Sequence, residues 1–329
     1  MKKFISLIMV LSLMTTLFGC GNDKGNTMDF SEAITSTETE RTTTQSSSAE
    51  ESSEAPSPSL MGNVTGELHS IYGERTGTDA TYTGLEPLPE VTLPVIDPDN
   101  LKNLDTTAVN HSFGVSKNGE PHEISVNNQT IYEKYGGICL DTSGEKCIYL
   151  TFDCGYENGY TEQILDTLQE KEVTAAFFIT MDYARTAPEL VARMINEGHI
   201  VGNHSTTHAN FSTISRLQMA EEIETLDNYL RANFGYSSPF FRFPEGTYTE
   251  SALDLVQNCG YKSVFWSSAY ADWDATNIKG AQYALETVTS RLHPGCVLLL
   301  HAVSPDNANA MGDIIDCARS QGYEFKSLK

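Results

Sequence analysis

From residue 148 onward, short apolar runs alternate with longer amphipathic stretches. The runs are rich in β-branched and aromatic residues, which predicts strands at 148–152, 175–179, 199–201, 240–243, 263–266, 297–300 and 323–325. The amphipathic stretches predict helices at 162–171, 187–197, 215–234, 249–259, 280–292 and 307–320. Strands that alternate with helices indicate an α/β fold with a parallel sheet and crossover helices. Seven such strands could close as a barrel or lie as an open sheet.

The first twenty residues have the pattern of an export signal. Lys2 and Lys3 precede an apolar run over 4–18, which is too short to span a bilayer as a helix, and the run ends at Gly19 and Cys20. The end of this run resembles a bacterial lipoprotein signal, in which Cys20 would receive lipid and become the new N-terminus. A plain cleaved signal is the alternative. Both interpretations predict export, and the first predicts a protein anchored to the outer face of the cytoplasmic membrane, facing the cell wall.

Residues 21–110 are predicted to be a disordered linker. The stretch 36–59 consists mainly of Ser, Thr, Glu and Pro without apolar periodicity, so it cannot bury enough surface to offset its backbone entropy. The Pro-rich stretch 85–98 could dock on the folded domain or stay free. The chain has 329 residues and a formal net charge of −23, of which the 16 acids and four bases of 21–110 supply −12. This acidity argues against nucleic acid as a partner.

Reactive side chains lie at or just after the ends of five of the predicted strands. They are Asp153, His204 with His208 four residues later, Arg242, Asp272 and His301. Active sites of parallel α/β folds lie beyond the carboxyl ends of the strands, so these residues are expected to meet at one end of the sheet. The pattern therefore predicts one catalytic site within residues 111–329, a domain that we expect to be monomeric.

The same segments resemble a known family. TFDCGYENG at 151–159, HSTTH at 204–208, RFPEG at 242–246, ADW at 271–273 and LLLHAVS at 298–304 are similar to the five motifs of the polysaccharide deacetylases, or NodB homology domain. GYENGYT, WSSAYADW, HAVSPDNA and SKNGEPHE resemble the branch of delta-lactam-biosynthetic de-N-acetylases, which act on N-acetylmuramic acid in peptidoglycan. The resemblance implies an irregular (β/α) barrel of about seven strands over 111–329. It also implies hydrolysis of an N-acetyl amide.

Amide hydrolysis needs an activated water and an acid that protonates the departing amine. Asp153 is expected to be the general base, although an Asp at this place could instead cap the next helix. Arg242 is expected to fork onto Asp153, orient it and lower its pKa. His301 is expected to be the general acid, with Asp272 orienting it and raising its pKa.

The rim of the site is predicted from the same motifs. Trp273 is expected to wall the pocket, and Tyr156 and Asn158 to contribute to it. The resemblance implies that the backbone N–H near Glu245 helps to form an oxyanion hole.

His204 and His208 are candidate ligands of a divalent metal, Zn, Co or Mn, because spacing of four residues can bring two imidazoles to one ion. The family's first motif has two adjacent Asp, the second being the third ligand, whereas this chain has Cys154. Three readings stay open: the Cys154 thiolate ligates, water fills the position, or catalysis depends little on a tightly held metal. We expect water there. Cys154 as a nucleophile is the least favoured reading.

Cys139 and Cys147 flank a turn signal at 141–144, so export would permit a disulfide between them. The expected substrate is peptidoglycan, at its N-acetylmuramic acid residues. The alternatives are another glycan (chitin oligomers, poly-N-acetylglucosamine or xylan) and a non-catalytic glycan-binding lipoprotein.

Overall fold

The computed structural model describes residues 81–329. The predicted signal with Cys20, and most of the predicted linker, lie outside these residues. Within the described part, no helix has the length and apolar character needed to cross a membrane.

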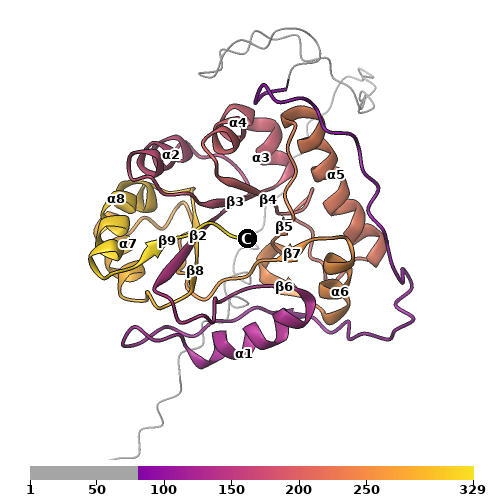
Figure 1. Ribbon diagram of the computed structural model, residues 1–329, viewed down its shortest axis with the longest axis horizontal. Coiled ribbons are helices and arrows are strands. Elements are labelled where there is room, and N and C mark those ends of the chain that lie inside the picture. The colour runs from indigo at the N-terminus through magenta and orange to yellow at the C-terminus, as the bar shows by residue number, and fades with distance from the viewer. Residues whose placement is uncertain (1–80) are drawn as a thin grey trace, which may run out of the picture.

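A curled parallel sheet of seven strands forms the centre of the molecule (Figure 1). Its strands are β2 (Cys147–Cys154), β3 (Ala176–Ile179), β4 (Ile200–Asn203), β5 (Phe240–Phe241), β7 (Lys262–Ser263), β8 (Cys296–His301) and β9 (Glu324–Phe325). They are arranged in the order β7-β5-β4-β3-β2-β8, with β9 beside β2. The predicted parallel α/β architecture is confirmed, and each predicted strand corresponds to one of these seven.

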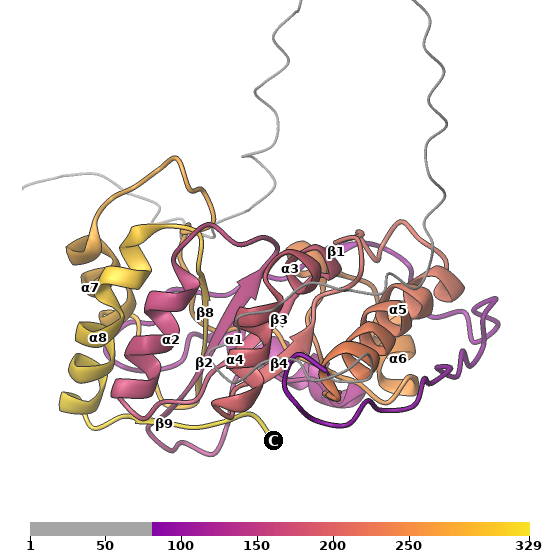
Figure 2. The ribbon, with the colours of Figure 1, turned by 90° about the horizontal axis from the view of Figure 1, so that it is seen from above.

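Helices cover the outer face of this sheet, as Figures 1 and 2 show. Six match predicted stretches: α2 (Thr161–Glu170), α4 (Pro188–Asn196), α5 (Arg216–Phe234), α6 (Glu250–Asn258), α7 (Ala281–Thr289) and α8 (Pro305–Ser320). Helices α1 (Glu123–Tyr132) and α3 (Met181–Thr186) and the 3-10 turns η2 (Glu133–Tyr135) and η3 (Pro244–Gly246) were not predicted. A small antiparallel pair, β1 (Val109–Asn110) with β6 (Thr247–Tyr248), was not predicted either.

The edges of the curled sheet are joined irregularly. The chain after β7 runs beside β8, where Ser267 N–H donates to Val297 O (2.9 Å) and Leu299 N–H donates to Ser268 O (2.9 Å). At the end of β7, the carbonyl oxygen of Ser263 accepts from Ile138 N–H at 2.9 Å. These bonds close the sheet into an irregular barrel rather than an open sheet.

Alternation along β2 decides which side chains reach the interior of the barrel. Ile148, Leu150, Phe152 and Cys154 pack in the core between the sheet and the helices. Successive side chains of a strand point to opposite faces, so Asp153 points to the inner side. The chemistry of the strand end therefore depends on Asp153.

The segment from 81 to 108 is packed on the domain, so the predicted boundary of the linker at residue 110 is wrong. Asn228 of α5 accepts from Val91 N–H and donates to Val91 O, both at 2.8 Å. Glu224 accepts from Leu93 N–H at 2.6 Å, and Arg216 donates to Ile96 O at 2.9 Å. The Pro-rich stretch thus docks along α5, where the indigo chain runs in Figure 1.

The disulfide that the sequence would permit between Cys139 and Cys147 is not formed. Both are free, buried thiols. Cys139 Sγ donates to Ser125 O (3.5 Å), whereas Cys147 Sγ donates to the Asp141 carboxylate (3.6 Å). The two thiols therefore bond to different parts of the core.

Candidate active site

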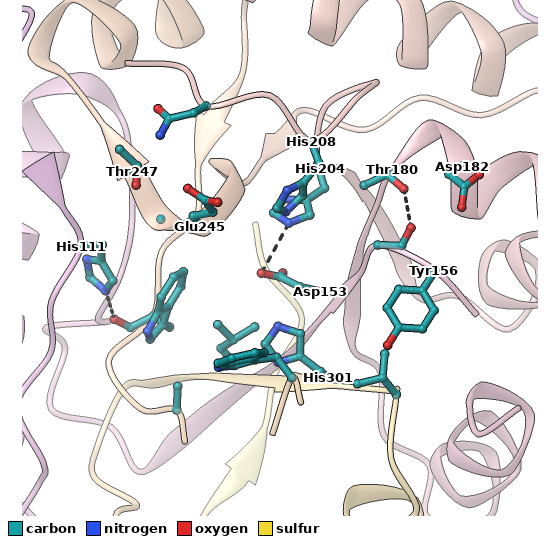
Figure 3. A pocket seen from close by; sticks show the side chains of 18 of the residues that line it. His111, Asp153, Tyr156, Thr180, Asp182, His204, His208, Glu245, Thr247 and His301 are labelled. Atoms are coloured by element: carbon teal, nitrogen blue, oxygen red, sulfur yellow. Dashed lines mark hydrogen bonds and ion pairs between the residues drawn. The ribbon is translucent and has the colours of Figure 1, made fainter. Parts of the chain in front are cut away.

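A pocket of about 760 Å³ opens at the carboxyl ends of the strands (Figure 3). Asp153 and His301 both line it and are register partners in the ladder between β2 and β8. Paired residues of parallel strands have side chains on the same face of the sheet. The two groups that the sequence predicts as base and acid therefore face the same cavity.

Asp153 is 8% exposed and lies between two partners. Its Oδ1 accepts from Arg242 Nη1 at 2.8 Å, and its Oδ2 is 3.7 Å from His204 Nε2. Burial alone would raise the pKa of Asp153, but the positive charge of Arg242 outweighs it and lowers the pKa. The carboxyl group is therefore held in its ionised form.

Arg242 is fully buried, and its contacts differ from the predicted fork. Only Nη1 bonds to Asp153, and the same nitrogen donates to Thr151 Oγ1 at 3.0 Å. Nε donates to Val264 O at 2.9 Å, and the guanidinium lies 4.2 Å from the centre of the Phe178 ring. Backbone carbonyls accept from the other guanidinium nitrogens, which a bidentate pair with Asp153 would need. Arg242 therefore orients Asp153 through one hydrogen bond.

His301 lies at the end of β8 with its imidazole fixed by Asp272. Nδ1 donates to Asp272 Oδ1 at 2.8 Å, and the His301 backbone N–H donates to Asp272 Oδ2 at 2.8 Å. Desolvation would lower the pKa of His301, but the charge and hydrogen bond of Asp272 raise it overall. Since Nδ1 is engaged, Nε2 is the nitrogen left to serve a substrate.

His204 has a defined tautomer. Its Nδ1 lies 2.8 Å from Arg242 O, and since a carbonyl oxygen can only accept, Nδ1 carries the hydrogen. Burial lowers the pKa of His204 to about 4, so the ring is neutral and Nε2 has a free lone pair. The ring of His208 is 4.9 Å away, centre to centre, and Figure 3 shows both rings beside Asp153. This arrangement suits ligation of a metal by nitrogen.

Cys154 does not lie with His204 and His208. Its side chain is 1% exposed and packs with the helix-facing core, while burial raises the pKa of its thiol well above the usual range. The suggested thiolate ligand is therefore wrong, as is the nucleophile. Within residues 81–329, no three His, Cys, Asp or Glu side chains are grouped to hold a metal. Among these residues, His204 and His208 are the two imidazoles that lie together at the pocket.

We predict that Cys154→Ala keeps its activity within about twofold of wild type and keeps the same response to metals. The thiol contacts the core rather than the pocket, so its loss removes only packing, at a cost of roughly 1 kcal/mol in stability. Initial rates and thermal melting of the two proteins check this. Loss of activity at full folding would show that the thiol takes part in the chemistry.

The rim contains most of the residues predicted for it. Tyr156 and Trp273 line the pocket and are 47% and 42% exposed. Glu245 also lines it and has a left-handed backbone, with φ of 58°. Asn158 was predicted to belong to the pocket but is not among its lining residues; its amide donates to Val303 O at 2.7 Å and so joins the loops after β2 and β8.

Some residues of the site were not predicted. Asn110 and Thr247 line one wall, where their side chains are 2.9 Å apart across the β1–β6 pair. These strands are too short for a periodic signal in the sequence. Asn307, which bonds to Asp272, lies in the HAVSPDNA segment, so that motif held a signal for it.

Comparison with solved structures defines the class of protein. A structure described as Bacillus subtilis PdaA, a family 4 carbohydrate esterase, superposes with a TM-score of 0.65 and 39% identity, covering 68% of this chain and 95% of that one. A family 4 carbohydrate esterase from Bacillus anthracis gives a TM-score of 0.56 and 38% identity, covering 68% and 96%. The fold is thus that of a family 4 carbohydrate esterase.

Sequence comparison defines the family. The polysaccharide deacetylase model matches residues 141–264. The peptidoglycan-N-acetylmuramic acid deacetylase PdaA of Bacillus subtilis (strain 168) is 40% identical over 221 residues, which are 67% of this chain and 84% of that protein. The chain belongs to the polysaccharide deacetylase family and is a hydrolase.

Proposed function

We propose that this protein removes the acetyl group from N-acetylmuramic acid residues of peptidoglycan and releases acetate. The observation that carries the proposal is the pair at the pocket floor. Arg242 lowers the pKa of Asp153, Asp272 raises the pKa of His301, and both groups face the same cavity. A base and an acid with opposite charge are what amide hydrolysis requires. The similarity to PdaA supports the choice of sugar.

In the first step, Asp153 takes a proton from water, whose oxygen bonds to the acetyl carbonyl carbon. Arg242 keeps the carboxylate aimed into the pocket through the 2.8 Å bond. The developing oxyanion needs donors at the pocket wall. The backbone at Glu245, turned by its positive φ, is the proposed source of one of them.

In the second step, the C–N bond breaks and His301 gives its Nε2 proton to the departing amine. The products are acetate and the free amino sugar, and His301 ends neutral. Asp272 stabilises the charged imidazole before this transfer, in the way that an acid needs for work near neutral pH.

His204 and His208 are the residues that would hold a divalent metal, with water in the place of a third protein ligand. A Zn, Co or Mn ion there would polarise the attacking water or the carbonyl oxygen as a Lewis acid. The neutral His204 ring with its free Nε2 fits this role.

We predict that chelation lowers the rate of acetate release and that added Zn²⁺, Co²⁺ or Mn²⁺ restores it. Two imidazoles bind a metal more weakly than three ligands do, so the ion should be removable. Rates before and after chelation, with elemental analysis of the protein, check this. No response together with no bound metal would mean that the two histidines orient substrate instead.

We predict that Asp272→Asn moves the basic limb of the pH–rate profile to lower pH by about one unit or more. His301 acts as an acid only while protonated, so activity is lost as pH rises through its pKa. Asp272 raises that pKa, and removing the charge lowers it. Rates measured across the pH range check this, and an unchanged basic limb would contradict the role given to Asp272.

Acetate release from defined muropeptides, with and without the peptide stem, tests the proposed substrate. A chitooligosaccharide deacetylase of Bradyrhizobium sp. (strain ANU 289) is 33% identical over 203 residues, 57% of this chain and 91% of that protein, so chitin oligomers belong in the panel. Release from peptidoglycan alone supports the proposal. Release from chitin oligomers but not from peptidoglycan would replace the substrate, and binding without release would make the protein a glycan-binding one.

We propose that the protein is a monomer exported to the cell wall and anchored by lipid on Cys20. Tyr82 N–H donates to Asn233 O (2.8 Å) and Thr83 Oγ1 donates to Phe234 O (2.6 Å), at the C-terminal end of α5. Helix α5 runs antiparallel to the strands, so this end lies opposite the pocket. A tether there would leave the pocket facing away from the membrane. Loss of lipid labelling in Cys20→Ala tests the anchor.

A further inference from the structure

Asn307 is a fully buried polar residue beside the acid. It lies in the first turn of α8 and is 0% exposed. Its Nδ2 donates to Asp272 Oδ2 at 2.6 Å and to His301 O at 3.0 Å, and its Oδ1 accepts from the Tyr270 hydroxyl at 2.6 Å. Three hydrogen bonds on one buried amide indicate a built position rather than chance packing.

The orientation of this amide is determined by its partners. The His301 carbonyl and the Asp272 carboxylate only accept, so both hydrogens of Nδ2 must point to them. The Tyr270 hydroxyl then faces Oδ1 and donates to it. Burial, with the charge of Asp272, raises the pKa of Tyr270, so this donor stays protonated. A flipped amide would set Oδ1 against two acceptors in a dry environment, which is costly.

The bonds form a closed ring around the backbone of His301. Its N–H donates to Asp272 Oδ2 (2.8 Å), the same oxygen accepts from Asn307, and Asn307 donates to the His301 carbonyl. The other carboxylate oxygen receives the imidazole Nδ1–H at 2.8 Å. Asp272 can therefore not turn away from the imidazole without breaking its bond to Asn307.

We propose that Asn307, fixed by Tyr270, is a positioning residue for the acid His301. It reaches neither substrate nor the imidazole directly and acts through Asp272. This proposal rests on the proposed function, because His301 serves as an acid only if the protein hydrolyses an amide. Tyr270 lines the pocket, so the ring of bonds also connects the pocket wall to the acid.

The test compares the full chain with Asn307→Ala and Tyr270→Phe, using Tyr283→Phe as the control. Tyr283 packs edge-on against Tyr270, with ring centres 6.1 Å apart, so the control removes a neighbouring hydroxyl outside the ring of bonds. The first measurement is the pKa of the His301 imidazole by NMR titration without substrate. The second is kcat and KM for acetate release as a function of pH.

We expect the pKa of His301 to fall in Asn307→Ala, to fall less in Tyr270→Phe, and to stay unchanged in Tyr283→Phe. Loosened positioning of the acid should lower kcat roughly ten- to hundredfold in Asn307→Ala with KM unchanged, and move the basic limb to lower pH. A fall in kcat with the His301 pKa and the pH profile unchanged would show a merely structural role and overturn the proposal.

An unchanged kcat and an unchanged His301 pKa would overturn it as well. Where Asn307→Ala does not fold, Tyr270→Phe decides, because it keeps Asn307 and removes only the donor to Oδ1. The titration needs no substrate. If the wild-type protein released no acetate, the proposed function would fail, while the comparison of pKa values would still decide whether Asn307 positions His301.

Discussion

Asp153→Asn is expected to lower kcat for acetate release roughly 10²- to 10⁴-fold, the range that a positioned base contributes. The amide keeps the size of the side chain but cannot take a proton from water. Arg242 would also face a neutral group, although its bonds to Thr151 and Val264 remain. Initial rates with the same glycan, alongside thermal melting, measure the effect apart from folding.

Asp182→Asn is the matched control for this substitution. Asp182 also lines the pocket, and its substitution is the same change from carboxylate to amide. Its side chain is exposed, however, and belongs to α3. We expect near wild-type kcat from it. Comparable losses in both variants would indicate a general effect of charge in the pocket, and full activity of Asp153→Asn would rule out Asp153 as the base.

His301→Ala is expected to lose amide hydrolysis roughly 10²- to 10⁴-fold while keeping most of its rate on aryl acetates. An amine leaves only with a proton, whereas an aryl oxide leaves without one, so the acid matters for the first substrate alone. Asp153→Asn should lose both activities, because both need the activated water. The ratio of the two rates in each variant therefore separates the acid from the base.

His122→Ala serves as the control for the loss of an imidazole. His122 caps the start of α1, where its Nδ1 accepts from Ile124 N–H at 3.2 Å, and it does not line the pocket. Its ratio of amide to ester rates should equal that of wild type. Equal losses of both activities in His301→Ala would contradict the assignment of His301 as the acid.

The strands could be predicted because a buried parallel strand is a nearly continuous apolar run, as Cys147–Cys154 and Cys296–His301 are. Helix α5 also has clear ends, with a capping box from Ser215 to Gln218 and Gly235 in the left-handed region. The docking of the segment from 81 to 108 on the domain could not be predicted. Its bonds are made by side chains of α5, such as Asn228, which lies 137 residues from Val91.

The candidate site was predicted where chemistry follows a strand end, as at Asp153 and His301. The site could not be predicted where the alternation of side chains along a strand sets their direction, or where backbone carbonyls compete for a hydrogen-bond donor. Cys154 follows Asp153 directly and for that reason faces the opposite side of β2. Arg242 donates from Nε to the carbonyl of Val264, which lies 22 residues away, and so does not form a bidentate pair with Asp153. Asn307 lies in the HAVSPDNA segment, but its hydrogen bond to Asp272 joins residues 35 positions apart and could not be predicted from that segment.

The most direct test of the central claim is mass spectrometry of muropeptides after incubation of purified peptidoglycan with the full-length protein. We predict that one acetyl group is lost from muramic acid and none from the neighbouring glucosamine, and that Asp153→Asn forms these products at least about a hundredfold more slowly. Peptidoglycan that keeps its acetyl groups on muramic acid after incubation with active protein would contradict it.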